Sequence, residues 1–132
     1  MPAMASIQVD FYELDDFVES QLGQIARQRF YFGPIELWAR LAARSLGDTV
    51  ERTLDLADVS IKDGYQGKGL FSALLAHMEA LAERKGIALY VESISSPIIR
   101  QALMRRGYSF SGGFSSNAWM TNAALKARRI RH

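Results

Sequence analysis

The order of patterns in the middle of this chain constrains its fold more than any other feature. Residues 49–61 alternate between apolar and polar side chains, which predicts one long strand, kinked or split into two. A turn with three glycines follows, and residues 70–85 then have the apolar spacing of a helix that ends at Gly86. Residues 88–91 form a short apolar strand of the kind that is buried in a parallel sheet. The chain is therefore expected to be an α/β protein.

The flanking segments predict further elements around this unit. In chain order they are a strand over 6–11, a helix from Leu14 to Ile25, a second helix over 34–46, a helix from Ser96-Pro97 to Gly107, and a hairpin of 108–110 with 114–120. With 132 residues and 48% hydrophobic content, we expect one domain over residues 1–123. Residues 124–132 are expected to be a flexible, basic C-terminal tail.

Composition and charge narrow the function classes. The chain has no cysteine, which excludes a disulfide scaffold, a thiolate zinc site and a cysteine nucleophile. No uncharged apolar run approaches the roughly 18 residues of a membrane span, so we expect a cytoplasmic protein without membrane insertion. Residues 27–132 hold all 16 Lys and Arg against nine acids, a surplus that favours polyanions such as a phosphorylated cofactor.

The glycine turn predicts a phosphate site, because a strand, a glycine-rich turn and a helix start present free backbone N–H groups to an anion. Gly64 and Gly69 have the spacing of a P-loop, but Leu70 and Phe71 stand where that motif requires Lys and Ser or Thr. A dinucleotide-binding turn is a weaker match, since the glycines begin late after the strand.

Two motifs together resemble the GNAT acetyltransferase superfamily over residues 54–110. Residues 66–71, Gln-Gly-Lys-Gly-Leu-Phe, are similar to its acetyl-CoA motif, Gln/Arg-x-x-Gly-x-Gly/Ala. Residues 96–108 are similar to its second signature, an Asn-led helix that closes on a Gly-Phe pair. The resemblance implies a mixed, mostly antiparallel sheet flanked by helices. Because the second predicted helix leaves only 49–61 for strands before the motif, we expect a trimmed set of strands there.

The resemblance also implies the chemistry and the cofactor site. Acetyl-CoA would give its acetyl group to a primary amine, with no metal, its diphosphate held by the turn and its pantetheine arm between two strands. The residues expected to bind it are Ser60, Ile61, Gln66, Gly67, Lys68, Gly69, Leu70, Phe71, Ser72 and Ser96. An open acceptor side, left by the trimmed sheet, favours a protein side chain or terminus over a small metabolite.

The expected catalytic residues are Glu92, Asp55 and Tyr90. Glu92 ends the strand that follows the helix, and Asp55 lies on the long strand, so each is a candidate base that acts through water. The alternative is that both are strand-end carboxylates paired with arginines. Tyr90, Tyr108 or water is the candidate acid for the leaving thiolate, because Leu103 stands where many family members carry a tyrosine for that role.

The sequence departs from the family pattern at three positions, and two of them, Phe71 and Leu103, allow a second function class. Phe71 replaces a small residue in the first motif, Ser96 replaces Asn in the second, and Leu103 replaces the tyrosine. The alternative function is a GNAT-fold protein without turnover that binds a partner protein, as a monomer or homodimer. A nucleic-acid-binding protein that uses the basic tail is a further alternative, although we do not expect a nucleic-acid partner because the tail lacks interleaved aromatic residues.

Overall fold

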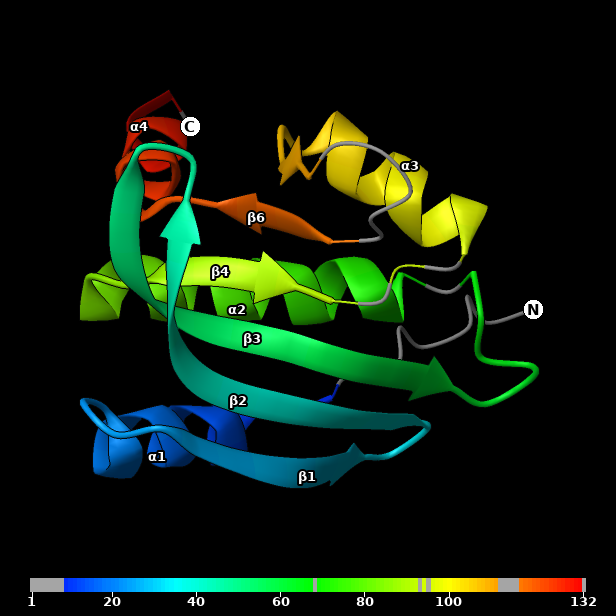
Figure 1. Ribbon diagram of the computed structural model, residues 1–132. Helices are drawn as coiled ribbons and strands as arrows, with labels where there is room; N and C mark the ends of the chain where they lie inside the picture. The colour runs from blue at the N-terminus through cyan, green and yellow to red at the C-terminus, as the bar shows by residue number, and fades with distance from the viewer. Residues whose placement is uncertain (1–8, 68, 93, 95, 112–116, 132) are drawn as a thin grey trace.

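The computed structural model describes residues 9–67, 69–92, 94, 96–111 and 117–131. In this part of the chain, a six-stranded sheet packs against four helices (Figure 1). The helices are α1 (Tyr12–Gln21), α2 (Leu70–Lys85), α3 (Pro97–Arg105) and α4 (Asn122–Arg131). The strands are β1 (Ala26–Phe32), β2 (Ile35–Leu46), β3 (Thr49–Ile61), β4 (Ala88–Val91), β5 (Ser109–Phe110) and β6 (Ala118–Met120).

The sheet has the strand order β1-β2-β3-β4-β6-β5. The β3–β4 pair is parallel, and the other paired strands of the described chain are antiparallel. This arrangement confirms the mixed, mostly antiparallel sheet expected from the sequence. Strands β3 and β4 are the two central strands of the sheet. The turn between β3 and α2 therefore follows a central strand that has a parallel neighbour.

The central unit of β3, α2 and β4 forms as the sequence predicts. Helix α2 begins at Leu70 and ends at Lys85, and Gly86 caps it in the left-handed conformation with φ 73°. Glycine is suited to that cap because it has no Cβ to clash with the helix. All four residues of β4 are buried, since the strand lies between β3 and β6 with α2 packed against it.

The predicted second helix is wrong, because residues 35–46 form strand β2. Its buried positions alternate through Ile35, Leu37, Ala39 and Leu41, which is the period of a strand rather than of a helix. Gly33 has φ 59° and lies in the tight turn of a hairpin between β1 and β2. Three strands, β1 to β3, therefore precede the glycine turn, where the sequence left only one stretch for them.

The predicted strand over residues 6–11 is not found in its described part. Residues 1–8 lie outside the described chain, and residues 9–11 are not in a strand. Helix α1 begins at Tyr12, whose backbone N–H donates to the Asp10 carboxylate at 2.9 Å. Phe11 is buried and packs edge to face against Phe32, so the segment before α1 is held against the sheet.

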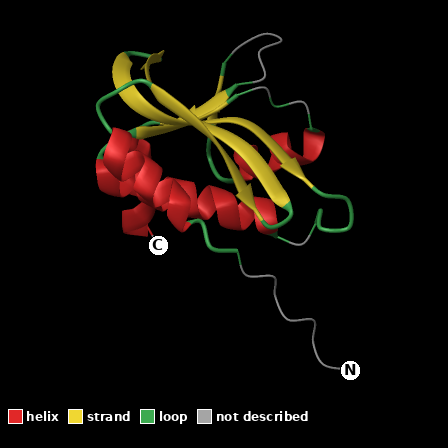
Figure 2. Ribbon diagram, turned by 90° about the horizontal axis from the view of Figure 1, so that it is seen from below, coloured by secondary structure: helices red, strands yellow, loops and turns green. Residues whose placement is uncertain are grey.

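Helices α1, α2 and α4 lie on one side of the sheet (Figure 2). The apolar core forms between them and the strand side chains that point their way, including Leu37, Leu54 and Leu89, with Leu74 and Met78 from α2. The opposite side of the sheet, called here the outer face, carries Arg40, Asp55, Tyr90 and Trp119, as the strand pairing requires. The two faces therefore differ sharply in polarity.

The expected basic tail is a helix over most of its length. Helix α4 buries Leu125 and packs against α2, and its first backbone N–H, that of Asn122, donates to Glu51 at 3.0 Å. The tip of the β2–β3 hairpin, which carries Glu51, bends toward α4 (Figure 1). None of the helices in the described chain is long and apolar enough to span a membrane.

Candidate functional site

The turn before α2 presents backbone N–H groups at the start of a helix. Gly64, Gly67 and Gly69 have φ values of 88°, 73° and 79°, which only glycine adopts readily. Gly69 precedes the helix without a side-chain cap, and the first helical hydrogen bond runs from the Ala73 N–H to the Gly69 carbonyl at 3.0 Å. The N–H groups before Ala73 have no acceptor within the helix, and the first turn has no acid. This helix start suits an anion.

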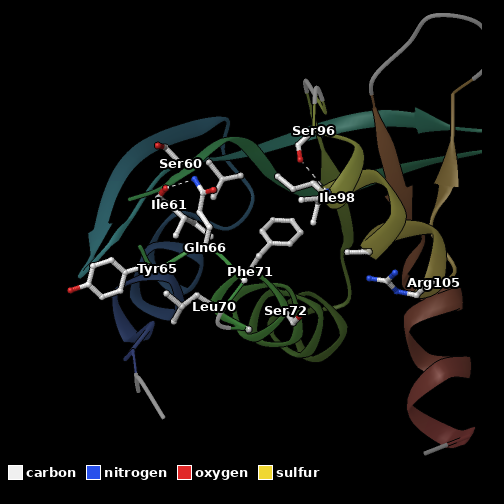
Figure 3. A pocket seen from close by; sticks show the side chains of 15 residues that line it. Ser60, Ile61, Tyr65, Gln66, Leu70, Phe71, Ser72, Ser96, Ile98 and Arg105 are labelled. Atoms are coloured by element: carbon white, nitrogen blue, oxygen red, sulfur yellow. Dashed lines mark hydrogen bonds between the residues drawn. The ribbon is translucent and has the colours of Figure 1, made fainter. Parts of the chain in front are cut away.

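A side-chain hydrogen bond ties the turn to the end of β3. The Gln66 amide donates to the Ile61 carbonyl at 3.0 Å, the contact drawn as a dashed line between them in Figure 3. Gln66 is the first residue of the first motif, and this hydrogen bond gives its side chain a structural role in the turn. It fixes the distance between the strand end and the helix start.

A pocket of about 450 Å³ lies between this turn, the end of β3 and helix α3 (Figure 3). Nine of the ten residues expected to bind the cofactor line it, and Lys68 lies outside the described residues. The nine are Ser60, Ile61, Gln66, Gly67, Gly69, Leu70, Phe71, Ser72 and Ser96. Six more residues complete the lining: Val59, Tyr65, Ile98, Ile99, Ala102 and Arg105. The two sequence motifs are thus brought together at one cavity.

The second motif supplies the far wall of the pocket. Ser96 caps α3, and its hydroxyl accepts the Ile99 N–H at 3.4 Å. Serine therefore performs the capping role of the Asn in the family pattern. Arg105, near the end of the same helix, turns its guanidinium toward the pocket on the side of Ser72 (Figure 3). It is a cation that the sequence analysis did not select.

The Phe71 ring occupies part of this pocket. Figure 3 shows it standing between Gln66 on one side and Ile98 on the other. The ring is partly buried and packs against the core, so the core as well as the cavity holds it. The cavity of about 450 Å³ remains with the ring in place, which means that Phe71 narrows the site without filling it.

Strands β3 and β4 separate beside the pocket. Their last paired residues are Leu56 and Val91, and the Glu92 N–H donates to the Leu56 carbonyl at 3.0 Å. Strand β3 then continues to Ile61 while β4 has ended. A β-bulge coincides with this point, because the β2 register shift leaves Ala57 without a partner on that strand. The result is a gap between two parallel strands, next to the glycine turn.

The two predicted bases meet in one ionic cluster on the outer face, with Arg40 and Arg44 of β2. Asp55 is fully buried, and its Oδ2 accepts from Arg40 at 3.1 Å and from Arg44 at 2.8 Å. Its Oδ1 accepts the Thr53 hydroxyl at 2.6 Å. Both arginines also contact Oε1 of Glu92, whose side chain is 20% exposed. The pairing with arginines that the sequence left as an alternative is therefore present.

Tyr90 lies beside this cluster, stacked between polar and aromatic neighbours. The Arg44 guanidinium lies 4.1 Å from its ring centroid, and the Trp119 ring stacks on it at 6.4 Å. Arg40 and Arg44 were missed from the sequence because residues 35–46 were assigned to a helix. In the structure the buried positions alternate from Ile35 to Leu41, but Trp38 breaks that alternation in the sequence, so the pattern fits a helix as well as a strand.

A second ionic cluster lies on the helical side of the sheet. Glu79 of α2 accepts from Arg106 at 2.6 and 2.9 Å and from the Tyr108 hydroxyl at 2.8 Å, and Arg128 of α4 lies 3.0 Å away. Burial raises the pKa of the Tyr108 hydroxyl well above its usual value, and the Glu79 charge adds to the rise. Tyr108 is thus a poor proton donor, and Leu103 nearby is fully buried.

Comparisons with known proteins identify the fold. No protein-family model matches the sequence, and no curated protein matches it. The KacTA–DNA complex has 16% identity and a TM-score of 0.60, over 100% of this chain and 91% of that chain. The toxin AtaT complexed with acetyl-methionyl-tRNAfMet has 10% identity and a TM-score of 0.61, over 92% and 89%. These toxins are GNAT-fold acetyltransferases, so the expected GNAT fold is confirmed.

A further structure holds the donor that the sequence analysis expects. It is a point mutant of the AtaT toxin bound to the C-terminus of the antitoxin AtaR and to acetyl-CoA, with 15% identity and a TM-score of 0.56. The match covers 72% of this chain and 62% of that one, so this chain spans about three fifths of its length. Two of the three structures contain nucleic acid, which gives no support to the expectation that such a partner is absent.

Proposed function

We propose that this chain transfers an acetyl group from acetyl-CoA to a primary amine. The observation that carries the proposal is the pocket between the two motifs, which lies directly beside the gap between β3 and β4. The N–H groups of Gly67, Gly69 and Leu70 suit the diphosphate, because a helix start favours an anion. Arg105 suits a further phosphate at the pocket mouth. Acetyl-CoA supplies an activated thioester when it is bound there.

Glu92 is the proposed base for the attacking amine. It stands at the end of β4, beside the gap, and Arg40 and Arg44 contact its Oε1. These arginines orient the carboxylate, and Oε2 is proposed to accept the proton that the amine loses, directly or through water. Asp55 is a positioning residue in this proposal, since it is buried and both of its oxygens bind donors. Tyr90 is the proposed donor of a proton to the sulfur as the carbon–sulfur bond breaks.

The proposed acceptor is an amine on a macromolecule. The expectation of a protein side chain or terminus rested on a trimmed sheet, which the three strands before the glycine turn contradict. The AtaT structure contains acetyl-methionyl-tRNAfMet, in which the amine of an aminoacyl-tRNA is acetylated. Proteins and unacetylated aminoacyl-tRNA each carry a primary amine, so both classes of macromolecule stay in the test. The acceptor panel therefore includes lysine peptides, peptide N-termini and aminoacyl-tRNA.

Calorimetry with acetyl-CoA tests the donor site. Ser72→Asp places a carboxylate in the first turn of α2, where it repels a diphosphate while the helix dipole tolerates it. Ala76→Asp is the matched control, because residue 76 is exposed on the same helix but does not line the pocket. We expect binding to be lost in the first variant and kept in the second. Equal affinities in both variants would place the donor elsewhere.

A thiol-release assay over the acceptor panel tests the transfer itself. Turnover with any of the amines supports the enzyme, and binding without turnover supports the second candidate, a GNAT-fold docking protein. That candidate is favoured by Phe71 in the pocket and by the buried Leu103. If Phe71 obstructs the donor, Phe71→Ala tightens acetyl-CoA binding by about tenfold, or ~1.4 kcal/mol. An unchanged dissociation constant would show that the ring leaves the donor site free.

A further inference from the structure

The charges of this chain are divided between two parts of the sequence. Residues 93–132 contain seven Lys and Arg and no Asp or Glu. The remaining 92 residues hold the other nine of the 16 Lys and Arg and all 14 Asp and Glu. The formal net charge of +2 therefore conceals an acidic main body and a strongly basic C-terminal part.

The fold gathers this basic part along one edge of the molecule. Residues 93–132 contribute α3, β5, β6 and α4, and β5 and β6 close one side of the sheet. Figure 1 shows α3 and α4 along the same edge, with β6 between them. The elements that carry these charges thus lie together, at the edge of the sheet opposite the β1 edge.

A groove of about 550 Å³ lies between the end of α3 and α4 on this edge. Arg105, Arg106 and Arg128 line it, and small or apolar residues complete it: Gly107, Met120, Ala124 and Ala127. Arg106 and Arg128 are held by Glu79 at 2.6 and 3.0 Å, so their guanidiniums are anchored. Lys126 is exposed on α4, next to the groove. We call these residues the α3–α4 groove.

We propose that the α3–α4 groove binds the phosphate backbone of a nucleic acid. Six of the seven cations in the segment are arginines, whose planar forks match phosphate oxygens. A nucleic acid carries one charge per nucleotide, and cations that bind it gain from the release of counterions. Because Arg106 and Arg128 are paired with Glu79, the exposed Arg105 and Lys126 are expected to make the larger contribution. Arg100 of α3 also stacks on Phe110 of β5 at 4.7 Å, which holds a further cation on this edge of the molecule.

The groove lies next to the donor pocket, because Arg105 lines both. A backbone bound in the groove would therefore pass the pocket mouth. The proposal itself does not depend on acetyl transfer, because binding is measured without acetyl-CoA. A chain that does not transfer acetyl groups can still bind a nucleic acid in the groove, and a chain that does not bind a nucleic acid can still transfer acetyl groups.

Fluorescence anisotropy of the full chain with a 20-nucleotide single-stranded RNA, and with a 20-base-pair DNA duplex as a second arm, tests the groove. We expect binding to weaken by about tenfold or more between 50 and 200 mM KCl, since each phosphate contact contributes about −0.7 to the log–log slope on a single strand. The double variant Arg105→Gln with Lys126→Gln removes two exposed cations and should flatten that slope by about 1.4.

The matched control is Arg27→Gln with Lys62→Gln, which removes the same charge from exposed positions on β1 and after β3. Arg128→Gln removes a cation that lines the groove, and we expect it to weaken RNA binding. Its melting temperature is measured as well, to show that the variant is folded. The proposal is overturned by absence of binding at 50 mM KCl, or by equal affinity of the double variant and its control. Tighter binding of an oligo-glutamate peptide of equal charge would overturn it in favour of an acidic protein partner.

Discussion

The two ionic clusters of this molecule have similar composition but differ in what they join. The Glu79 cluster connects α2 with the end of α3 and with α4, and donors contact both oxygens of the carboxylate. The Glu92 cluster lies across β2, β3 and β4 on the outer face, and its arginine contacts are made to Oε1 of Glu92. One cluster lies between helices, and the other lies beside a gap between strands.

The surroundings of a carboxylate, rather than the number of its arginine partners, decide whether it acts on stability or on chemistry. Both Glu79 and Glu92 contact two arginines, so counting ion pairs does not distinguish them. Glu79 is buried where three elements meet, and a buried charge that loses its partners is costly. Glu92 ends a strand at the gap, where a substrate amine has access. We expect substitutions at Glu79 to act on folding and those at Glu92 to act on turnover.

The largest expected effect is on stability, from Glu79→Gln. The substitution removes the negative charge that faces Arg106 and Arg128 and replaces one of the two acceptor oxygens with an NH2 group, so Arg106 and the Tyr108 hydroxyl cannot keep all their hydrogen bonds. We expect a loss of about 3 kcal/mol in the free energy of unfolding, as for a broken buried ion pair. Urea denaturation measures it, with Glu13→Gln on the exposed side of α1 as the control. A loss equal to that of the control would contradict a structural role.

The next effect is on turnover, from Glu92→Gln. Loss of a general base lowers kcat by about 100-fold or more, while the melting temperature changes little because the side chain is partly exposed. The acceptor found by the thiol-release panel is the substrate for this measurement. Glu36→Gln is the control. Glu36 lies on the outer face, on strand β2, but it pairs with Arg29 and not with the arginines of the Glu92 cluster. Wild-type kcat in Glu92→Gln would remove Glu92 from the reaction.

Sequence signals that act over a few residues predicted their elements well. Helix α2 has the expected bounds, because Gly69 and Gly86 mark its two ends in the backbone conformations that only glycine adopts readily. Helix α3 begins where Ser96-Pro97 predicts, since a serine cap and a proline in the first turn need no tertiary partner. Six of the nine expected pocket residues lie within these two local motifs, and Ser60, Ile61 and Ser72 lie beside the first of them.

Strand β2 was not predictable in the same way. Residues 35–46 are rich in Ala, Leu and Arg, which favour a helix, and their apolar positions fit either period. The pairing of β2 with β1 and β3 decides the outcome, and partners up to 26 residues apart in sequence, such as Ile35 and Ile61, are invisible to local patterns. Because β2 was predicted as a helix, the positions of Arg40 and Arg44 on the outer face were not predicted either. The basic helix α4 was missed because its packing on α2 is equally non-local.

A smaller effect is expected from Arg44→Lys, which tests whether an arginine of the Glu92 cluster orients the carboxylate. Arg44 binds Asp55 and Glu92 and stacks on Tyr90, and lysine keeps the charge but loses the planar fork. We expect kcat to fall by about tenfold, or ~1.4 kcal/mol, as Glu92 loses its orientation. The dissociation constant for acetyl-CoA should stay unchanged, and Arg52→Lys is the exposed control. A change in that constant instead of kcat would argue against positioning.

The smallest effect concerns pH and belongs to the Glu79 cluster. Burial alone would raise the pKa of Glu79, but the hydrogen bonds from Arg106 and Tyr108 outweigh it and hold the pKa below its usual 4.5. The unfolded chain therefore binds the proton first as pH falls, so the stabilisation is complete above pH 4.5 and is lost as pH falls through the folded value. The stability difference between wild type and Glu79→Gln should narrow over that range.

Glu19→Gln separates this narrowing from a general effect of acid. The Lys85 hydrogen bond also lowers the pKa of Glu19, but that carboxylate is exposed, and solvent screens such pairs strongly. Urea denaturation between pH 3 and pH 7 should show a clear narrowing for Glu79→Gln and almost none for Glu19→Gln. Parallel curves for wild type and Glu79→Gln would mean that the Glu79 charge contributes nothing to folding. The contrast between the two clusters would then rest on hydrogen-bond geometry instead of ionisation.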